Sequence, residues 1–248
     1  MEALTTKRHT LFLFARVFFL ILLFLLAGLI TFFLSERLNT GAVAAVSKPP
    51  LVIIDAGHGG EDGGAVGVNG VYEKNLNLAM ANELASLLRG AGVEVILTRT
   101  EDRLLYGDGE DVPGERKKND LKNRLAVAEE NPEAIFVSIH MNTFSVAKYS
   151  GLQVYYADTE GSQALASAIQ NSVRRDVQPQ NHRVPHAASS SIYLLYHAVG
   201  TSVLVECGFL SNPEECVLLS QKDYQSRLCF SIFCGMMKYM ENMGGSAP

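Results

Sequence analysis

The chain has 248 residues and a formal net charge of −5, with 48% hydrophobic and 19% charged residues. This length and composition accommodate one soluble domain of ordinary size plus an additional segment. The part after residue 35 is acidic, with a formal charge of −7 from 18 Lys and Arg against 25 Asp and Glu. It contains no arginine-rich run, so nucleic acid is not an expected partner.

The additional segment lies at the N-terminus. Residues 17–34, VFFLILLFLLAGLITFFL, carry no charge and follow Lys7, Arg8 and Arg16. Such a run of apolar residues is about long enough to cross a hydrocarbon core of roughly 30 Å as a helix. The basic flank favours an N-terminus that stays in the cytoplasm while the remainder of the chain is exported.

We therefore expect a cytoplasmic flank at 1–10, a transmembrane anchor at 11–34 and a linker at 35–50. The sequence AVAA at 43–46 resembles a signal-peptidase site, so a cleaved signal segment remains the alternative. Both interpretations place the rest of the chain outside the cytoplasmic membrane, anchored in the first case and secreted in the second.

Strands and helices alternate from residue 51 onward. Strands are expected at 51–55, 93–100, 134–140, 151–157 and 201–209, and helices at 73–92, 118–130, 162–176, from about 212, and at 223–241. Polar loops are expected at 101–117 and 177–190. The mostly apolar strands predict an α/β fold with a single twisted, mostly parallel or mixed sheet and helices on both faces. The folded domain is expected at 51–241, with a disordered tail at 242–248.

Three of the apolar strands end near an ionisable side chain. His58 follows the first strand in a glycine cluster, His140 ends FVSIH, and Glu206 ends VLVE. Open α/β sheets place ligand sites at the carboxyl ends of their strands. Burial of such side chains without partners would cost several kcal/mol. A metal site and a set of separate structural residues both remain open on this evidence.

A phosphate site is excluded by the motifs. A P-loop requires Gly-Lys-Ser/Thr, which occurs nowhere in the chain. A dinucleotide fingerprint requires a third glycine where Asp62 stands, and Glu61 with Asp62 would repel a pyrophosphate. The four cysteines form no CxxC pair, so neither a zinc ribbon nor a redox motif is predicted. Cys229 and Cys234 fit packed thiols, and the sequence leaves their disulfide status open.

Four motifs in order resemble a known family. They are IDAGHGGEDGGAVG (54–67), YEKNLNL (72–78), SIHMN (138–142) and LVECGFLSN (204–212), supported by TR at 98–99 with Asp102 and by LKNR at 121–124. The chain resembles the zinc-dependent N-acetylmuramoyl-L-alanine amidases, of the amidase 3 type, over about residues 51–240. The family acts on bacterial peptidoglycan and cleaves between the lactyl group of N-acetylmuramic acid and the L-alanine of the stem peptide.

By this resemblance His58, Glu73 and His140 are the ligands of one Zn²⁺ ion per chain, and Glu206 is the catalytic carboxylate. Glu73 is implied by the resemblance alone, because a glutamate at a helix start is otherwise explained by the helix dipole. Two imidazoles and one carboxylate leave a fourth position for water, as catalytic zinc sites do. Cys207 adjoins Glu206 but is expected on the opposite face of the strand, so it is not expected to be a nucleophile.

The remaining polar candidates are given lesser roles. We expect Asp55 to brace the glycine loop or a ligand histidine. Asn142 and Arg183 are expected in the substrate groove. The other histidines are expected at the surface, in or beside the polar loop at 177–197, and they are His182, His186 and His197. Of these, His186 is a candidate for the substrate groove. His9 is expected in the cytoplasmic flank.

The domain organisation favours one group within this family, and two alternative functions remain open. No wall-binding repeat is present, and no long helical insertion interrupts 140–206, so the site is expected to be open. A single amidase domain behind a membrane anchor is similar to the germination-specific members of the family, which act on spore-cortex peptidoglycan. A zinc peptidase that cuts within the stem peptide and a catalytically silent peptidoglycan-binding module remain the alternatives. No nucleotide is expected to bind.

Overall fold

The computed structural model describes residues 16, 18–32, 51–107, 109 and 111–244. The chain divides into two compact units, Met1–Lys48 and Pro49–Pro248. In the first unit, residues 18–32 are helical. Within the described part of the chain, no helix combines the length and the apolar character that crossing a membrane requires. A third of the expected anchor, at residues 11–15, 17 and 33–34, lies outside the described residues.

The second unit is built around one six-stranded mixed sheet with the strand order β2-β1-β3-β6-β4-β5. The strands are β1 (Val52–Ala56), β2 (Val95–Leu97), β3 (Ile135–Asn142), β4 (Gln153–Tyr156), β5 (His186–Ala187) and β6 (Ser202–Phe209). β1 pairs in parallel with β2 and β3, and β3 pairs in parallel with β6. β4 runs antiparallel to β6 and parallel to β5.

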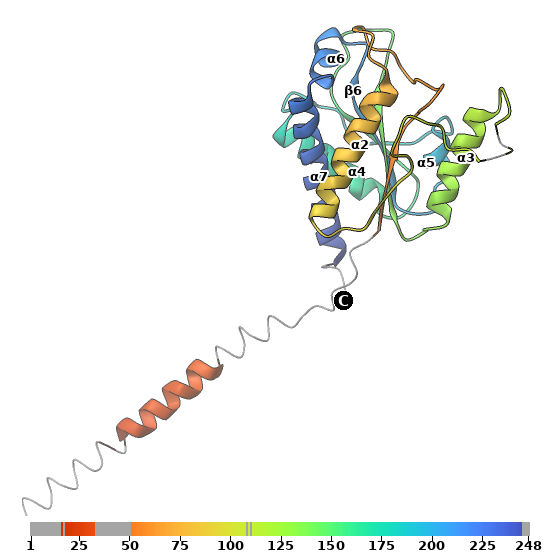
Figure 1. The fold of residues 1–248 in the computed structure, drawn as a ribbon. Helices are drawn as coiled ribbons and strands as arrows, with labels where there is room; N and C mark the ends of the chain where they lie inside the picture. The colour runs from red at the N-terminus through yellow and green to blue at the C-terminus, as the bar shows by residue number, and fades with distance from the viewer. Residues whose placement is uncertain (1–15, 17, 33–50, 108, 110, 245–248) are drawn as a thin grey trace, which may run out of the picture. The chain divides into compact units, whose positions relative to one another are not determined.

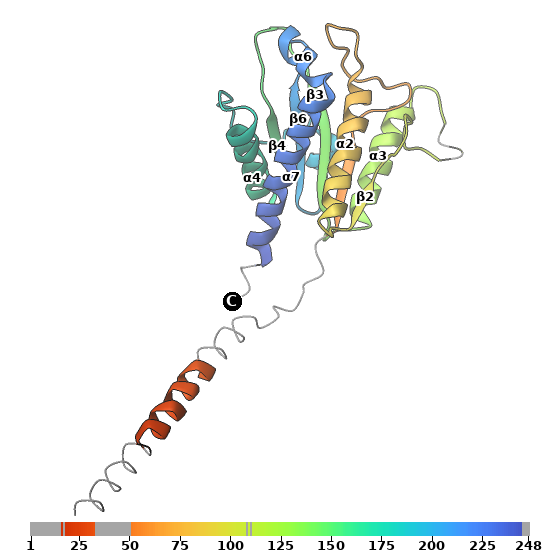
Figure 2. The ribbon, with the colours of Figure 1, turned by 60° about the vertical axis from the view of Figure 1, so that its left-hand side comes forward.

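Helices cover both faces of the sheet (Figures 1 and 2). The helices are α2 (Glu73–Gly90), α3 (Arg116–Glu129), α4 (Ser162–Asp176), α5 (Tyr193–Tyr196), α6 (Pro213–Leu219) and α7 (Lys222–Gly244). α2, α4 and α7 pack on one face and form the large apolar core with alternate strand residues. α3 and α5 cover the other face around smaller clusters. The predicted mixed α/β sheet with helices on both faces is confirmed.

The sequence explains the local structure of these elements. Leu76, Met80, Leu84 and Leu88 recur at four-residue intervals along α2 and are all buried, which sets the helix against the sheet. α6 begins after Asn212, whose side chain accepts a hydrogen bond from the Glu215 amide at 3.0 Å. This is an N-cap followed by proline in the first helical turn.

Some boundaries differ from those expected. The second strand covers only Val95–Leu97 of the expected 93–100, and α7 continues to Gly244, beyond the expected end at 241. Residues 245–248 of the expected tail lie outside the described residues. The loop expected at 177–190 contains the short strand β5, and α5 was not expected. These two elements are too short to show a periodicity in the sequence, and β5 pairs with the edge of β4.

Candidate metal centre

His58 lies on a tight turn after β1, near the carboxyl ends of the parallel strands. Its φ is 61°, and it is the sole non-glycine residue with positive φ among those described. This conformation is costly for an ordinary residue, so other contacts must hold the turn. A Cβ on the preceding Gly57 would collide with the imidazole of His140. Glycine at this position therefore allows the His58 turn to approach β3 closely.

Arg124 of α3 is one of the groups that hold the turn. Its guanidinium is 1% exposed and donates to Asp55 Oδ1 at 2.6 Å. It also donates to the carbonyl oxygens of Ala56 and His58, each at 2.7 Å, and to Asp120 Oδ2 at 2.9 Å. One buried side chain thus binds the end of β1 and the backbone of the candidate ligand at once.

Arg99, which is also buried, binds the turn from the other side. Its Nε donates to the carbonyl of Ala56 at 2.8 Å, and its Nη2 donates to that of Gly57 at 2.9 Å. The same Nη2 reaches the Lys74 carbonyl in the first turn of α2. Arg99 therefore fixes the His58 turn relative to the helix that begins with Glu73.

Asp55 braces the turn through Arg124 rather than through a histidine. It is fully buried and accepts hydrogen bonds from Thr98 Oγ1 at 2.7 Å and Ser138 Oγ at 2.5 Å. Burial alone would raise the pKa of Asp55, but the Arg124 guanidinium and the two hydroxyls hold it below its usual value. Asp55 is therefore joined to the turn through Arg124, and no hydrogen bond joins it to His58.

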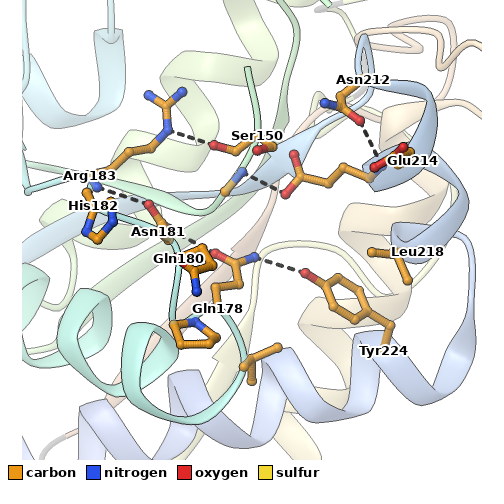
Figure 3. A pocket seen from close by; sticks show the side chains of 14 residues that line it. Ser150, Gln178, Gln180, Asn181, His182, Arg183, Asn212, Glu214, Leu218 and Tyr224 are labelled. Carbon is orange, nitrogen blue, oxygen red and sulfur yellow. Dashed lines mark hydrogen bonds between the residues drawn. The ribbon is translucent and has the colours of Figure 1, made fainter. Parts of the chain in front are cut away.

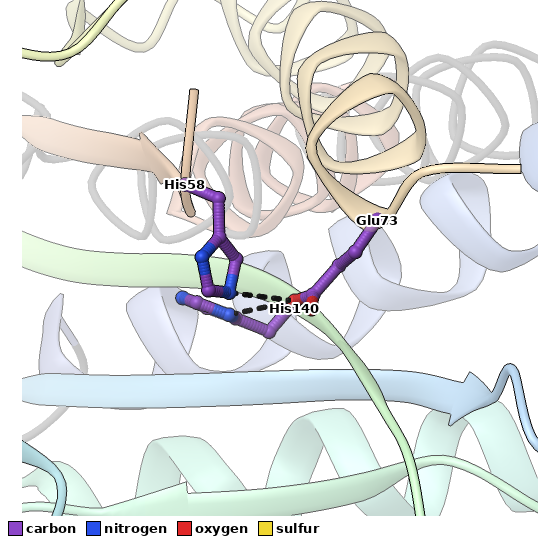
Figure 4. Close-up of side chains that lie close together, drawn as sticks. All are labelled: His58, Glu73 and His140. Atoms are coloured by element: carbon purple, nitrogen blue, oxygen red, sulfur yellow. Dashed lines mark hydrogen bonds and ion pairs between the residues drawn. The ribbon is translucent and has the colours of Figure 1, made fainter. Parts of the chain in front are cut away.

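Glu73 is the first residue of α2, and its carboxylate faces both histidines (Figure 4). Its Oε1 lies 3.2 Å from His58 Nε2 and 2.9 Å from His140 Nδ1. The Ala65 amide donates to Oε2 at 2.8 Å, and the Met141 amide donates to Oε1 at 3.1 Å. The backbone therefore fixes the carboxylate in the position where the two imidazoles converge.

The cluster of His58, Glu73 and His140 fits a metal ion. Each residue offers one ligand atom, and the three atoms lie within 4.8 Å of one another. The two imidazole centroids are 4.9 Å apart at an interplanar angle of 73°, so both rings can present a nitrogen to one point. Two nitrogens and one carboxylate oxygen are a donor set that suits zinc with one position left open.

The electrostatics of the cluster favour positive charge. His58 Nδ1 lies 2.8 Å from Asp62 Oδ2, on the side of the ring opposite Glu73. Burial lowers the pKa of His58, but Asp62 and Glu73 outweigh burial and raise it to about 9. Ligand histidines commonly bond a carboxylate through the nitrogen that does not face the metal. Asp62 thus stands where such a partner is expected.

Glu206 lies beside the cluster on the neighbouring strand. It pairs in register with His140 across β3 and β6, so both side chains are on the same face of the sheet. Its Oε2 is buried and has no hydrogen-bond partner among the described residues. Burial, to which Glu73 adds, raises the pKa of Glu206 to about 7, although both histidines oppose the shift. A carboxyl group with a free buried oxygen and this pKa is suited to take up and release a proton.

The other expected residues lie outside the cluster. Asn142 is partly exposed at the end of β3, two residues beyond His140. Arg183 and His182 line a separate cavity of about 600 Å³ between α6 and the loop after α4 (Figure 3). His186 and His197 also lie outside the cluster, on β5 and after α5. His9 lies outside the described residues.

The thiols are consistent with a structural role. Cys207 is fully buried in the large core, on the face opposite Glu206, and Cys229 is buried in the same core. All four cysteines are free in the structure. Cys234, which was expected to be packed, is partly exposed.

Comparison with known proteins decides the family. A family model described as N-acetylmuramoyl-L-alanine amidase matches residues 52–238. The chain belongs to this family.

Individual amidases are similar over most of the folded unit. The germination-specific N-acetylmuramoyl-L-alanine amidase of Bacillus subtilis is 33% identical over 195 residues, which are 78% of this chain and 81% of the relative. The CwlD amidase of Clostridioides difficile, solved in complex with the GerS lipoprotein, is 38% identical with a TM-score of 0.74, covering 78% of this chain and 99% of that chain. AmiC2 of Nostoc punctiforme is 31% identical with a TM-score of 0.67, covering 78% and 98%. The chain is accordingly an N-acetylmuramoyl-L-alanine amidase, an enzyme of peptidoglycan.

Three residues of this amidase site were not assigned by sequence reasoning. Asp62 had been considered only as a group that repels phosphate, although its spacing of four residues after a candidate ligand histidine was a usable signal. Arg99 and Arg124 lie in the short matches TR and LKNR, but no role had been derived for either. Their function depends on contacts across 43 and 68 residues of sequence, to the Ala56 carbonyl, which no local pattern reveals.

Proposed function

We propose that the chain is a zinc-dependent amidase in which His58, Glu73 and His140 hold the metal. The convergence of three ligand atoms within 4.8 Å carries the proposal. The unpartnered buried oxygen of Glu206 beside them supports it, because such an atom is costly unless a ligand or substrate group satisfies it. The bond cleaved is the amide between the lactyl group of N-acetylmuramic acid and the L-alanine of the stem peptide.

Different residues of the chain have different roles in this hydrolysis. Bound zinc supplies Lewis-acid chemistry, lowering the pKa of water and polarising a carbonyl. Glu206 takes the proton from the attacking water and returns it to the departing amine of L-alanine, and its buried oxygen without a hydrogen-bond partner is free to carry that proton. Asp62 holds His58 in the tautomer that leaves Nε2 free to bind the metal. No serine or cysteine nucleophile takes part.

The place of action follows from the relatives and the N-terminal sequence. The similarity to a germination-specific amidase supports a role in spore-cortex or cell-wall maturation. The apolar residues 17–34 and the basic residues before them support an anchor that holds the domain at 51–241 outside the cytoplasmic membrane. Cleavage near 43–46 would instead release the domain. Turnover of purified spore-cortex peptidoglycan, compared with vegetative-wall peptidoglycan, tests the spore role.

Digestion of purified peptidoglycan tests the reaction. The zinc-loaded chain should release peptides that begin with L-alanine and leave glycan strands without L-alanine, as identified by mass spectrometry. Glu206→Gln should abolish turnover and retain zinc, whereas Glu129→Gln makes the same change at an exposed end of α3 and should leave turnover unchanged. Cuts between amino acids of the stem peptide would contradict the reaction, and an active Glu206→Gln would contradict the role of Glu206.

A further inference from the structure

Arg183 is held in one orientation between α4 and β5. Its guanidinium carbon lies 4.6 Å from the ring centroid of Phe209 and 5.8 Å from that of Tyr149. Its Nε donates to the carbonyl of Ser150 at 3.0 Å. Stacking and this hydrogen bond fix the planar guanidinium, so little side-chain freedom remains to be lost when it binds a ligand.

The two terminal nitrogens of Arg183 have no protein partner among the described residues. In Figure 3 the only bond drawn from the guanidinium is that of Nε to Ser150. Glu215 lies near enough for Arg183 to affect its pKa, yet its oxygens accept from the amides of Gly151 at 2.8 Å and Phe209 at 2.7 Å. No ion pair joins the two within 4 Å. A fixed arginine with both terminal nitrogens free matches the two oxygens of a carboxylate.

The rest of the adjoining cavity offers less to a ligand. Gln178 donates to the Tyr224 hydroxyl and accepts from the Leu152 amide, and Asn181 donates to the Leu152 carbonyl. These amides are therefore already committed to the protein. Arg183, at the edge of this cavity, has two terminal guanidinium nitrogens that are free to bind a ligand.

The sheet sets the distance between Arg183 and Glu206. Gln153 of β4 pairs in register with Glu206, and its Nε2 donates to the Val184 carbonyl at 2.5 Å. The Arg183 guanidinium lies over the ring of Phe209, which follows Glu206 by three residues on β6, so it lies roughly 10 Å from Glu206 along the strand.

We propose that Arg183 binds a free carboxylate within the first three residues of the stem peptide and makes the amidase prefer acidic over amidated stems. This inference rests on the proposed function, because it takes Glu206 as the point of cleavage. An extended peptide spans at most about 3.3–3.6 Å per residue, so roughly 10 Å corresponds to three residues from the scissile bond. The part after residue 35 carries a formal charge of −7, so an acidic peptide needs a local cation to bind here.

Binding of synthetic N-acetylmuramoyl tripeptides to the zinc-loaded full chain tests the proposal. The ligands differ only in whether the carboxyl groups of the second and third residues are free, amidated singly or all amidated. Isothermal titration uses Glu206→Gln as the background, so that the ligand is not cleaved. Adding Arg183→Gln should raise the Kd for the free acid about 10- to 100-fold, the range for a hydrogen bond to a charged group, and leave the Kd for the fully amidated ligand unchanged.

Matched variants separate this role from a structural one. Arg175→Gln removes an exposed arginine that pairs with Asp176 on α4, and it should leave both Kd values unchanged. Arg183→Lys keeps the charge but loses the planar fork, so an intermediate Kd for the free acid is expected.

The outcomes are distinct. An equal loss of affinity for free and amidated ligands in Arg183→Gln would overturn the proposal. Equal Kd values for free and amidated ligands when Arg183 is present would also overturn it. The single amides show which carboxylate Arg183 binds. Because the readout is binding, a chain that shows the expected Kd pattern but cuts peptidoglycan elsewhere would contradict the proposed function but not the binding of a carboxylate by Arg183.

Discussion

Removal of the Arg124 guanidinium should lower both the free energy of unfolding and the zinc affinity, although Arg124 is not a metal ligand. In Arg124→Met, Asp55 keeps its two hydroxyl donors but loses the cation that neutralises it in a fully buried position. The carbonyls of Ala56 and His58 lose their donor at the same time. Breaking a buried ion pair by removing one partner costs about 3–5 kcal/mol in the free energy of unfolding. For a unit of this size each kcal/mol corresponds to about 2–4 °C in Tm.

Urea unfolding and zinc titration of the purified chain measure both consequences. The free energy of unfolding should fall by about 3–5 kcal/mol, and zinc affinity should fall as well, because the backbone of His58 is no longer held. Asp55→Asn combined with Arg124→Met should recover part of the stability, since one of the two buried carboxylates that Arg124 pairs with is then neutral, while Asp120 keeps its charge. Arg89→Met removes an exposed arginine at the end of α2 and serves as the control. A loss below about 1 kcal/mol, typical of a surface change, or strict additivity in the double variant would refute the reasoning.

Three further perturbations test other parts of the site. Asp62→Asn should weaken zinc binding by about 10- to 100-fold in a competitive chelator titration, because His58 loses its orienting carboxylate. Gly57→Ala should lower the zinc content measured by mass spectrometry, because the new Cβ displaces the His140 ring. The folded-state pKa of Asp55 lies below its unfolded value of about 3.9, so its stabilisation should be present above about pH 4 and be lost as the pH falls further, with Asp55→Asn flattening the acid side of the stability profile.

Controls for these changes are available in the same chain. Glu61→Gln alters the exposed carboxylate next to Asp62 and should leave zinc affinity unchanged. Gly90→Ala places its Cβ in open space at the end of α2 and should leave zinc content unchanged. Equal effects in a variant and its control would show that general destabilisation, rather than the proposed contact, is responsible.

The parts of the structure that local patterns govern were predictable. The alternation of apolar strands and amphipathic helices gave the sheet with helices on both faces. The helix at Ser162–Asp176 has the bounds expected. His140 and Glu206 could be proposed together because each ends a buried strand, and parallel pairing then places them side by side. The antiparallel direction of β4 had no local signal, because it depends on which sheet edge remains free after β6 has paired.

The supporting groups of the site were harder to predict, for a physical reason. Arg124 acts by donating hydrogen bonds to backbone carbonyls of the turn after β1. Because every residue has a backbone carbonyl, the residue type at the accepting position does not indicate the contact. Glu73 is the first residue of a helix, where a glutamate is explained equally well by a favourable interaction with the helix dipole. Only the resemblance to a family distinguished a metal ligand from a residue that stabilises the helix. The structure then shows the Glu73 carboxylate facing both histidines.

The zinc content of the folded chain tests the central claim most directly. Elemental analysis after reconstitution and removal of loosely bound metal should find one zinc per chain in the wild type and in Glu206→Gln. His58→Ala and His140→Ala should each lose it, while His197→Ala, which alters a histidine in contact with the Tyr193 ring, should keep it. Less than one zinc per wild-type chain, or full zinc retention in both ligand variants, would contradict the assignment of this cluster as the metal centre.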